Sequence, residues 1–156
     1  MAICIFKCLA MVHAHPSYHS IYDERLHKLS AKKTHKVSFP TPAEILDFIL
    51  KIEDHFNFPS EVYVISSIYM DRLATISHIY LDQNNWKRVV LISLVVAAKY
   101  MIDTSIRNCD FIHIFPHVTD FYALEKEYLK HIHYRLFVER LHYNVYYFAV
   151  NSMNAR

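Results

Sequence analysis

Hydrophobic side chains recur every three or four residues along much of the chain, and this spacing predicts amphipathic helices. The first strong pattern covers residues 42–55, where the apolar face is made by Ile45, Phe48, Ile49 and Ile52. Thr41 and Glu44 are spaced as a capping box, and Pro42 suits the first helical position. A second helix follows, for which we expect Ser60 to be the cap. Its predicted buried side is Val62, Ile65, Ile68, Tyr69 and Leu73.

The third predicted helix, over residues 86–101 and preceded by a capping Asn, is apolar on nearly every side. Ten residues from Val89 to Ala98 are interrupted only by Ser93, so this helix should lie at the centre of the domain. The β-branched residues in this run also fit a strand, but its length and the lack of hairpin turns favour a helix. The run is about half as long as a membrane span requires.

Two more helices complete the predicted core. A short one over 108–115 stops at Pro116, and a longer one begins at a cap supplied by Thr119 or Asp120. The apolar stripe of this longer helix is Phe121, Leu124, Tyr128, Leu129 and Ile132.

Helical patterns also lie on either side of these five helices. A further helix is predicted over 141–151, and residues 22–29 of the polar, His-rich leader could also be helical. We therefore predict an all-α fold, a single five-helix domain over 41–153 with an additional helix on either side. Residues 1–40 form a leader that is partly flexible or helical.

The composition narrows the possible functions. The chain of 156 residues contains no glycine, which excludes the glycine-dependent phosphate loops, dinucleotide fingerprints and nucleophile elbows. A formal net charge of +2 implies no general affinity for nucleic acid. Three cysteines form no paired framework, and a reducing, intracellular location is the simpler interpretation. Ala2 stands where N-myristoylation needs a glycine, so no stable membrane anchor is expected.

Candidate chemical sites are weak. Cys109, His113 and His117 are four residues apart, as zinc ligands on a helix can be, but Pro116 interrupts the helix and no fourth ligand has a clear spacing. Cys109 also has no evident activating group for nucleophilic catalysis. We therefore expect no metal site, no cofactor, no small-molecule substrate and no catalytic residue.

Several short motifs occur in a fixed order over about a hundred residues. They are Tyr69-Met70-Asp71-Arg72-Leu73, Asn85-Trp86-Lys87-Arg88, Ala97-Ala98-Lys99, Asp103, Asn108-x-Asp110-Phe111, Leu124-Glu125, Tyr128-Leu129 and Tyr147-Phe148. From Pro42 to Phe148 the sequence resembles a cyclin box, and within the cyclins it is most similar to the cyclin Y and phosphate-pathway (P/U-type) group.

This resemblance implies a regulatory subunit that binds and activates a cyclin-dependent protein kinase. Docking on the regulatory helix of the kinase N-lobe completes the Lys–Glu pair needed for phosphoryl transfer. The kinase-binding residues implied are Lys99, Glu125, Leu124 and Tyr128. The structural residues of the motifs are Asp71, Arg72, Trp86 and Asp103.

Two alternatives remain open. From spacing alone, Lys99 and Glu125 could form an ordinary structural ion pair. The chain could also be a cyclin-fold adaptor that binds proteins other than kinases. The sequence departs from the family pattern at Asp71, because the helix over 42–55 contains no Arg to pair with it, and at Ile102 and Tyr122, which replace usual polar residues. These departures concern the choice of kinase more than the fold.

Overall fold

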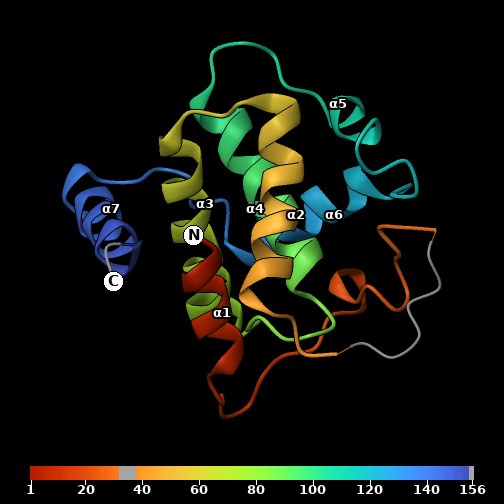
Figure 1. The fold of residues 1–156 in the computed structure, drawn as a ribbon, viewed down its shortest axis with the longest axis horizontal. Coiled ribbons are helices and arrows are strands. Elements are labelled where there is room, and N and C mark those ends of the chain that lie inside the picture. Colours follow the sequence, from red (N-terminus) through yellow and green to blue (C-terminus); the bar gives the residue numbers. More distant parts are fainter. Residues whose placement is uncertain (32–37, 155–156) are drawn as a thin grey trace.

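The computed structural model describes residues 1–31 and 38–154. Its elements are α1 (Ala2–Ala10), the 3-10 helix η1 (Ser20–Tyr22), α2 (Pro42–Phe56), α3 (Ser60–Ser77), α4 (Trp86–Met101), α5 (Asn108–Ile112), α6 (Phe121–His131) and α7 (Arg140–Asn154). No strand occurs in these ranges, which confirms the predicted all-α class. Helices α2 to α6 form the five-helix core, with α1 and α7 outside it (Figure 1).

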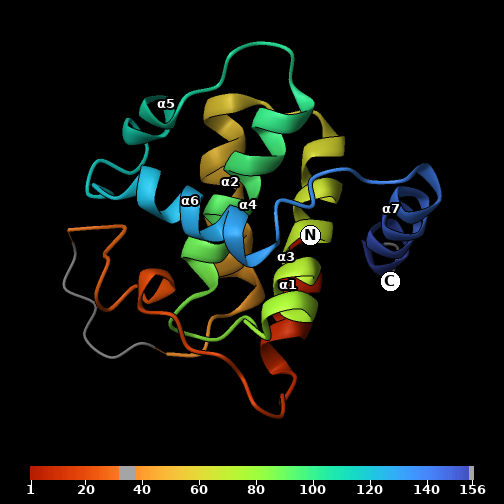
Figure 2. The same ribbon diagram turned by 180° about the vertical axis from the view of Figure 1, so that it is seen from behind.

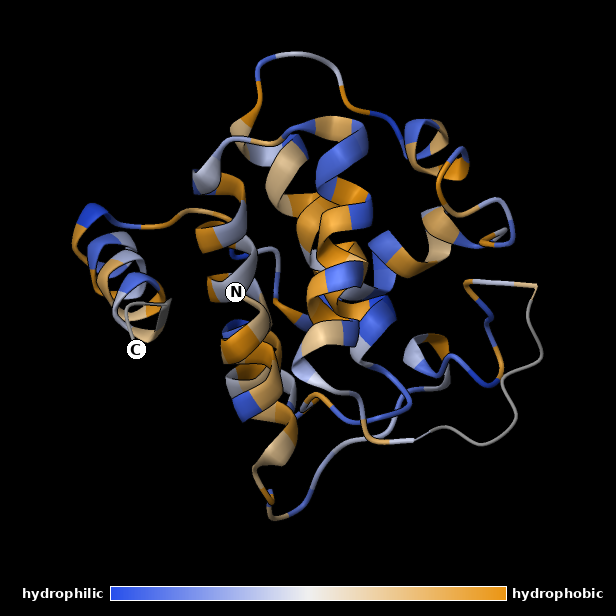
Figure 3. Ribbon diagram, viewed as in Figure 1, coloured by the Kyte–Doolittle hydropathy of each residue, from blue (hydrophilic) through white to orange (hydrophobic). Residues whose placement is uncertain are grey.

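Helix α4 is the centre of the domain, as its apolar sequence predicted. All ten residues from Val89 to Ala98 are buried, and α3 makes the most extensive contact with this helix. Seen from behind, α6 crosses close to α4 (Figure 2). The hydrophobic colour is concentrated on the helices that surround this centre (Figure 3). Burial of this apolar surface is the main source of stability for such a domain.

Of the two N-terminal caps predicted for α2 and α3, one is correct. The capping box of α2 is confirmed, since the Glu44 N–H donates to Thr41 Oγ1 at 3.2 Å and the Thr41 N–H donates to Glu44 Oε2 at 2.7 Å. The predicted cap at Ser60 is wrong. Pro59 is the N-cap of α3, and the Ser60 hydroxyl donates to the Glu61 carboxylate at 3.3 Å.

Helix α5 is shorter than predicted. It ends at Ile112, and residues 113–115 continue as a turn in which the Phe115 N–H donates to the Phe111 carbonyl at 2.9 Å. Pro116 follows directly, and a proline restricts the residue before it to extended conformations.

The N-terminal region contains the largest errors of the sequence analysis. Residues 2–10 form a helix that was not predicted, with Ile5 and Leu9 buried where α1 packs on α2 and α7. The predicted helix over 22–29 is absent, and turns follow η1 instead. Asp23 explains this, because its buried carboxylate accepts hydrogen bonds from the backbone N–H and the guanidinium of Arg25 at 2.6–3.2 Å. Such side-chain bonds to nearby backbone compete with helix formation.

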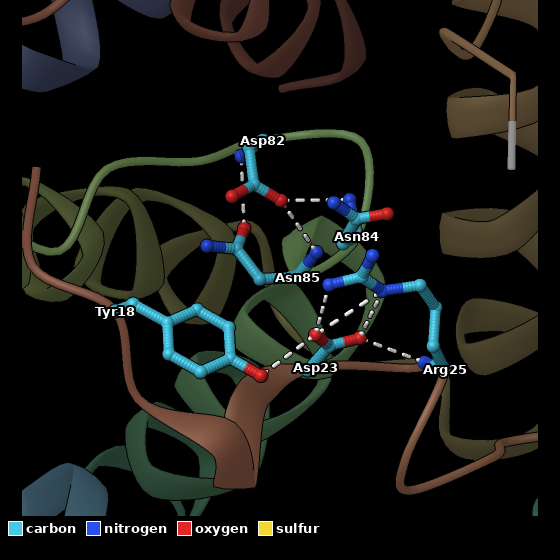
Figure 4. Close-up of polar contacts among 6 residues, drawn as sticks. All are labelled: Tyr18, Asp23, Arg25, Asp82, Asn84 and Asn85. Carbon is cyan, nitrogen blue, oxygen red and sulfur yellow. Dashed lines mark hydrogen bonds and ion pairs between the residues drawn. The ribbon is translucent and has the colours of Figure 1, made fainter.

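The turn at Asp23 is also held by Tyr18 and by the connection between α3 and α4. The Tyr18 hydroxyl donates to Asp23 at 2.9 Å, and the neighbouring Asp82 carboxylate accepts from the backbone N–H groups of Asn84 and Asn85 (Figure 4). The Glu24 N–H donates to the Asn84 carbonyl at 2.8 Å. This part of the leader is therefore fixed against the α3–α4 connection.

Candidate protein-docking site

Three helix ends meet at one charged cluster. Lys99 lies in the last turn of α4, Asn108 is the first residue of α5, and Glu125 lies in the second turn of α6. The Lys99 ammonium donates to Glu125 Oε1 and Oε2 at 2.8 and 2.9 Å, and to Asn108 Oδ1 at 2.7 Å. Asn108 Nδ2 donates in turn to Glu125 Oε2 at 3.0 Å. These three residues form a closed hydrogen-bonded group, which we call the triad.

The triad remains accessible to a partner. The side chains of Lys99 and Glu125 are 27% and 17% exposed. A carboxylate can accept about four hydrogen bonds and an ammonium can donate three. Glu125 therefore keeps room for one further bond, whereas Lys99 must exchange a bond within the triad to reach a partner.

Exposed apolar side chains lie beside the triad. Ile112 follows Asn108 by four residues on α5, and Tyr122 precedes Glu125 by three residues on α6, so each shares a helix face with a triad member. Both side chains are exposed, as is Met101 at the end of α4. A charged centre with apolar neighbours suits the recognition of an amphipathic helix.

Two of the four predicted contact residues do not reach this surface. Leu124 and Tyr128 are fully buried, because they belong to the apolar stripe of α6 that faces the core. Neither side chain is exposed in this chain, and their part in kinase binding stays a prediction. Only Lys99 and Glu125 are brought together at the surface.

The structural motif residues have different roles. Arg72 donates to the backbone carbonyls of Arg135 and Phe137, and so fixes the segment after α6 to α3. Trp86 packs edge-to-face on Phe48 of α2, with ring centroids 5.4 Å apart.

The two acidic residues of the motifs are at the surface. Asp71 and Asp103 are both exposed. The partner of Asp71 is Tyr146 of α7, whose pKa is raised first by burial and then by its hydrogen bond to the Asp71 carboxylate.

The sequence analysis missed the role of Arg88, which is completely buried. Its guanidinium donates to the carbonyls of Ile21 and His27 at 2.8 and 3.1 Å and to Asp120 Oδ2 at 2.7 Å. Arg88 therefore links α4 to the leader and to the start of α6. Burial lowers the pKa of this guanidinium, and the nearby Asp120 carboxylate opposes that effect. A lone Arg beside a run of ten apolar residues was the available signal.

A histidine pair joins the leader to the end of α6. His131 Nδ1 is hydrogen-bonded to the Tyr22 hydroxyl at 2.8 Å, and the His19 ring lies with its centroid 4.2 Å from that of His131. Burial lowers the pKa of His131 the most, and the nearby His19 lowers it further. Glu127 raises this pKa, and Lys130 lowers it.

We expect this arrangement to make folding depend on pH. Because the pKa of His131 is lower in the folded state than its usual value of about 6.5, its stabilising effect is complete above that pH and is lost as the pH falls toward the folded-state pKa. Urea denaturation between pH 7.5 and 5.0 should show falling stability, and His131→Gln should flatten this slope. His142→Gln, an exposed position on α7, is the control. Equal slopes for all three proteins would contradict the prediction.

Clusters of His, Cys, Asp and Glu ligands and membrane-spanning helices are both absent from the described ranges. Within residues 1–31 and 38–154, no group of three or more His, Cys, Asp or Glu side chains could hold a metal ion. No helix in the same ranges is long and apolar enough to cross a membrane.

The structure is thus a helical domain with a partly exposed charged triad at its surface. The sequence model of the family described as "Cyclin, N-terminal domain" matches residues 18–137, well over half of the chain. The protein therefore belongs to the cyclin family, whose domains are regulatory rather than catalytic. No solved structure matches the chain.

Proposed function

We propose that this chain is a regulatory subunit that binds and activates a cyclin-dependent protein kinase. The observation that carries the proposal is the triad, with its partly exposed charges beside exposed Ile112 and Tyr122. Membership of the cyclin family supports it. The occupant of this surface is the regulatory helix of the kinase N-lobe, whose apolar side packs beside α5 and α6.

The mechanism requires no chemistry from this chain. Pressing the regulatory helix inward completes the Lys–Glu ion pair of the kinase and so prepares it for phosphoryl transfer. Glu125 accepts a hydrogen bond from the partner helix, and Lys99 exchanges one of its bonds within the triad for a bond to a carbonyl or carboxylate oxygen of that helix. We place the protein inside the cell, in the cyclin Y or P/U-type group, on the strength of its sequence motifs. The boundary between leader and box at residue 41 stays a prediction.

A cyclin-fold adaptor is the second candidate, and a specific surface favours it. Leu141, Val145 and Phe148 follow one another along α7 at helical spacing and are all well exposed. An apolar helix face of this kind suits a protein partner. In this case the chain would hold proteins other than a kinase through α7.

Recovery of partners from a native lysate distinguishes the two functions. The bound proteins are identified by mass spectrometry, and kinase activity is measured on the beads. We expect a cyclin-dependent kinase with activity, and at least about a tenfold loss of both for Tyr122→Glu, since a charge then enters a desolvated contact. Leu141→Glu on α7 is the matched control and should keep both. Recovery of other proteins without kinase, abolished by Leu141→Glu, would favour the adaptor.

A further inference from the structure

Sulfur-bearing side chains gather in one groove between α1, α3 and α7. The chain has three cysteines and five methionines, and five of these eight side chains line a cavity of about 350 Å³ with mostly apolar walls. They are Cys4, Cys8, Met11, Met70 and Met153. We call this cavity the sulfur groove. Nothing in the proposed kinase docking uses it.

Two sulfur atoms in the groove are in direct contact. Cys4 Sγ donates to Met153 Sδ at 3.4 Å, although the two residues are 149 positions apart in the chain. Cys8 lies one helical turn after Cys4 on the same face of α1. As residues, Cys4 is half-buried and Cys8 is exposed, and both line the groove. Burial raises the pKa of the Cys8 thiol, and Cys4 and Asp71 raise it further, so a bound cation is needed to hold this thiol deprotonated.

The spacing of the two cysteines does not suit a disulfide. Residues four apart on a helix have Cβ atoms about 5–6 Å apart, whereas a disulfide needs about 3.5–4.5 Å. A single ion can bridge such thiols without unwinding the helix. Three sulfur atoms spread evenly around one metal ion at about 2.3 Å lie about 4 Å apart. Cys4 Sγ and Met153 Sδ are 3.4 Å apart, so a small separation of these two atoms would let both bind one ion.

The ligand types select the metal. Thiolate and thioether sulfur are soft donors, which favour Cu(I) over ions that prefer nitrogen and oxygen. Zinc would need further nitrogen, oxygen or thiolate ligands, and His13, which also lines the groove, is stacked on the Tyr80 ring at 3.8 Å. The Asp71 carboxylate lines the same groove and supplies a negative charge that favours a cation.

We propose that Cys4, Cys8 and Met153 bind one Cu(I) ion and thereby join α1 to α7. The exchange involves no change of oxidation state: each coordinating thiol releases its proton to solvent, and a copper–sulfur bond takes its place. The Met153 thioether coordinates through a lone pair without losing a proton. Bound copper stabilises the contact of the N-terminal helix with the C-terminal helix.

Competition with bicinchoninate under anaerobic conditions tests this site on the full chain. Supplied as its Cu(I) complex, bicinchoninate should lose one equivalent of copper to the protein. Loss of a residue that only orients a metal ligand weakens metal binding by about 10–100-fold. We therefore expect Cys4→Ser and Cys8→Ser each to weaken copper binding by about 100-fold or more, and Met153→Leu by about tenfold. X-ray absorption should show sulfur neighbours at about 2.3 Å.

Matched variants outside the groove serve as controls. Cys109→Ser and Met101→Leu change the same residue types and should bind copper as the unaltered chain does. Copper should also raise the melting temperature, since it binds the folded state. This rise should be smaller in Met153→Leu. Leu keeps the apolar volume of Met, so this variant still tests the site if a cysteine variant fails to fold. The proposal is overturned if no copper leaves bicinchoninate, if the control variants lose as much affinity, or if Met153→Leu binds normally.

Discussion

Asp120→Ala is expected to lower the free energy of unfolding by about 3–5 kcal/mol, because it leaves a buried guanidinium without its counter-charge. Arg88 is completely buried, and its Nη2 is 2.7 Å from Asp120 Oδ2. The Asp120 side chain is 23% exposed, so water can enter the space that it leaves, and the lower end of the range is the more realistic value. The carbonyls of Ile21 and His27 cannot neutralise the charge.

Two control variants are compared with Asp120→Ala. Each protein is unfolded in urea, and circular dichroism reports the unfolding. Glu127→Ala removes an ion pair of the same length, 2.7 Å to Lys130, whose side chains are 37% and 48% exposed. It should have a much smaller effect on stability, because exposed ion pairs contribute little. The double variant Arg88→Met/Asp120→Ala should regain much of the loss, since no charge is then buried. If Asp120→Ala costs no more than Glu127→Ala, the buried link does not hold the leader, α4 and α6 together.

The core helices could be predicted because their signals are local. The length of the run from Val89 to Ala98 and the lack of hairpin turns beside it favoured a buried helix over a strand. Thr41 with Glu44 forms a capping box within four residues. These patterns depend on helical periodicity and on hydrogen bonds between near neighbours, which a sequence displays directly.

The errors arose where distant contacts decide the structure. Helix α1 has nine residues and no side-chain cap, so its helicity depends on packing against α2 and α7 rather than on propensity. Asp23 diverts residues 22–29 from a helix through its bonds to Arg25 and Tyr18. No local pattern shows that Arg88 meets Asp120, thirty-two residues later.

The arrangement of the candidate site was predicted only in part, since a Lys99–Glu125 ion pair was one of two open alternatives and the structure contains that pair. The resemblance to cyclins singled out Lys99 and Glu125, and the structure pairs them, but Asn108 was named only as part of a motif and proves to bond both. Leu124 was named as a kinase-binding residue through the resemblance, although it belongs to the apolar stripe of its helix. Neighbouring residues on a helix point about 100° apart, so Leu124 faces the core while the Glu125 side chain is partly exposed.

Charge reversal within the triad should separate recognition from simple structural support. Lys99→Glu and Glu125→Lys each place like charges where the Nζ–Oε1 distance is 2.8 Å. Either change should reduce the affinity for the kinase by about 100-fold or more, since breaking a partly buried, hydrogen-bonded charge pair at an interface costs about 2–5 kcal/mol. Circular dichroism should show an intact helical fold, because the triad lies outside the hydrophobic core and its charged side chains are partly exposed.

The double variant Lys99→Glu/Glu125→Lys makes the distinction. Exchanging the charges re-forms the ion pair, so the free energy of unfolding should return to within about 1 kcal/mol of the original value. If the triad recognises the kinase, affinity measured by calorimetry should stay at least about tenfold weaker, because each charge now faces the wrong partner group. Restored stability together with restored affinity would mean that Lys99 and Glu125 only hold α4 to α6, and that the apolar surface around Ile112 and Tyr122 does the binding.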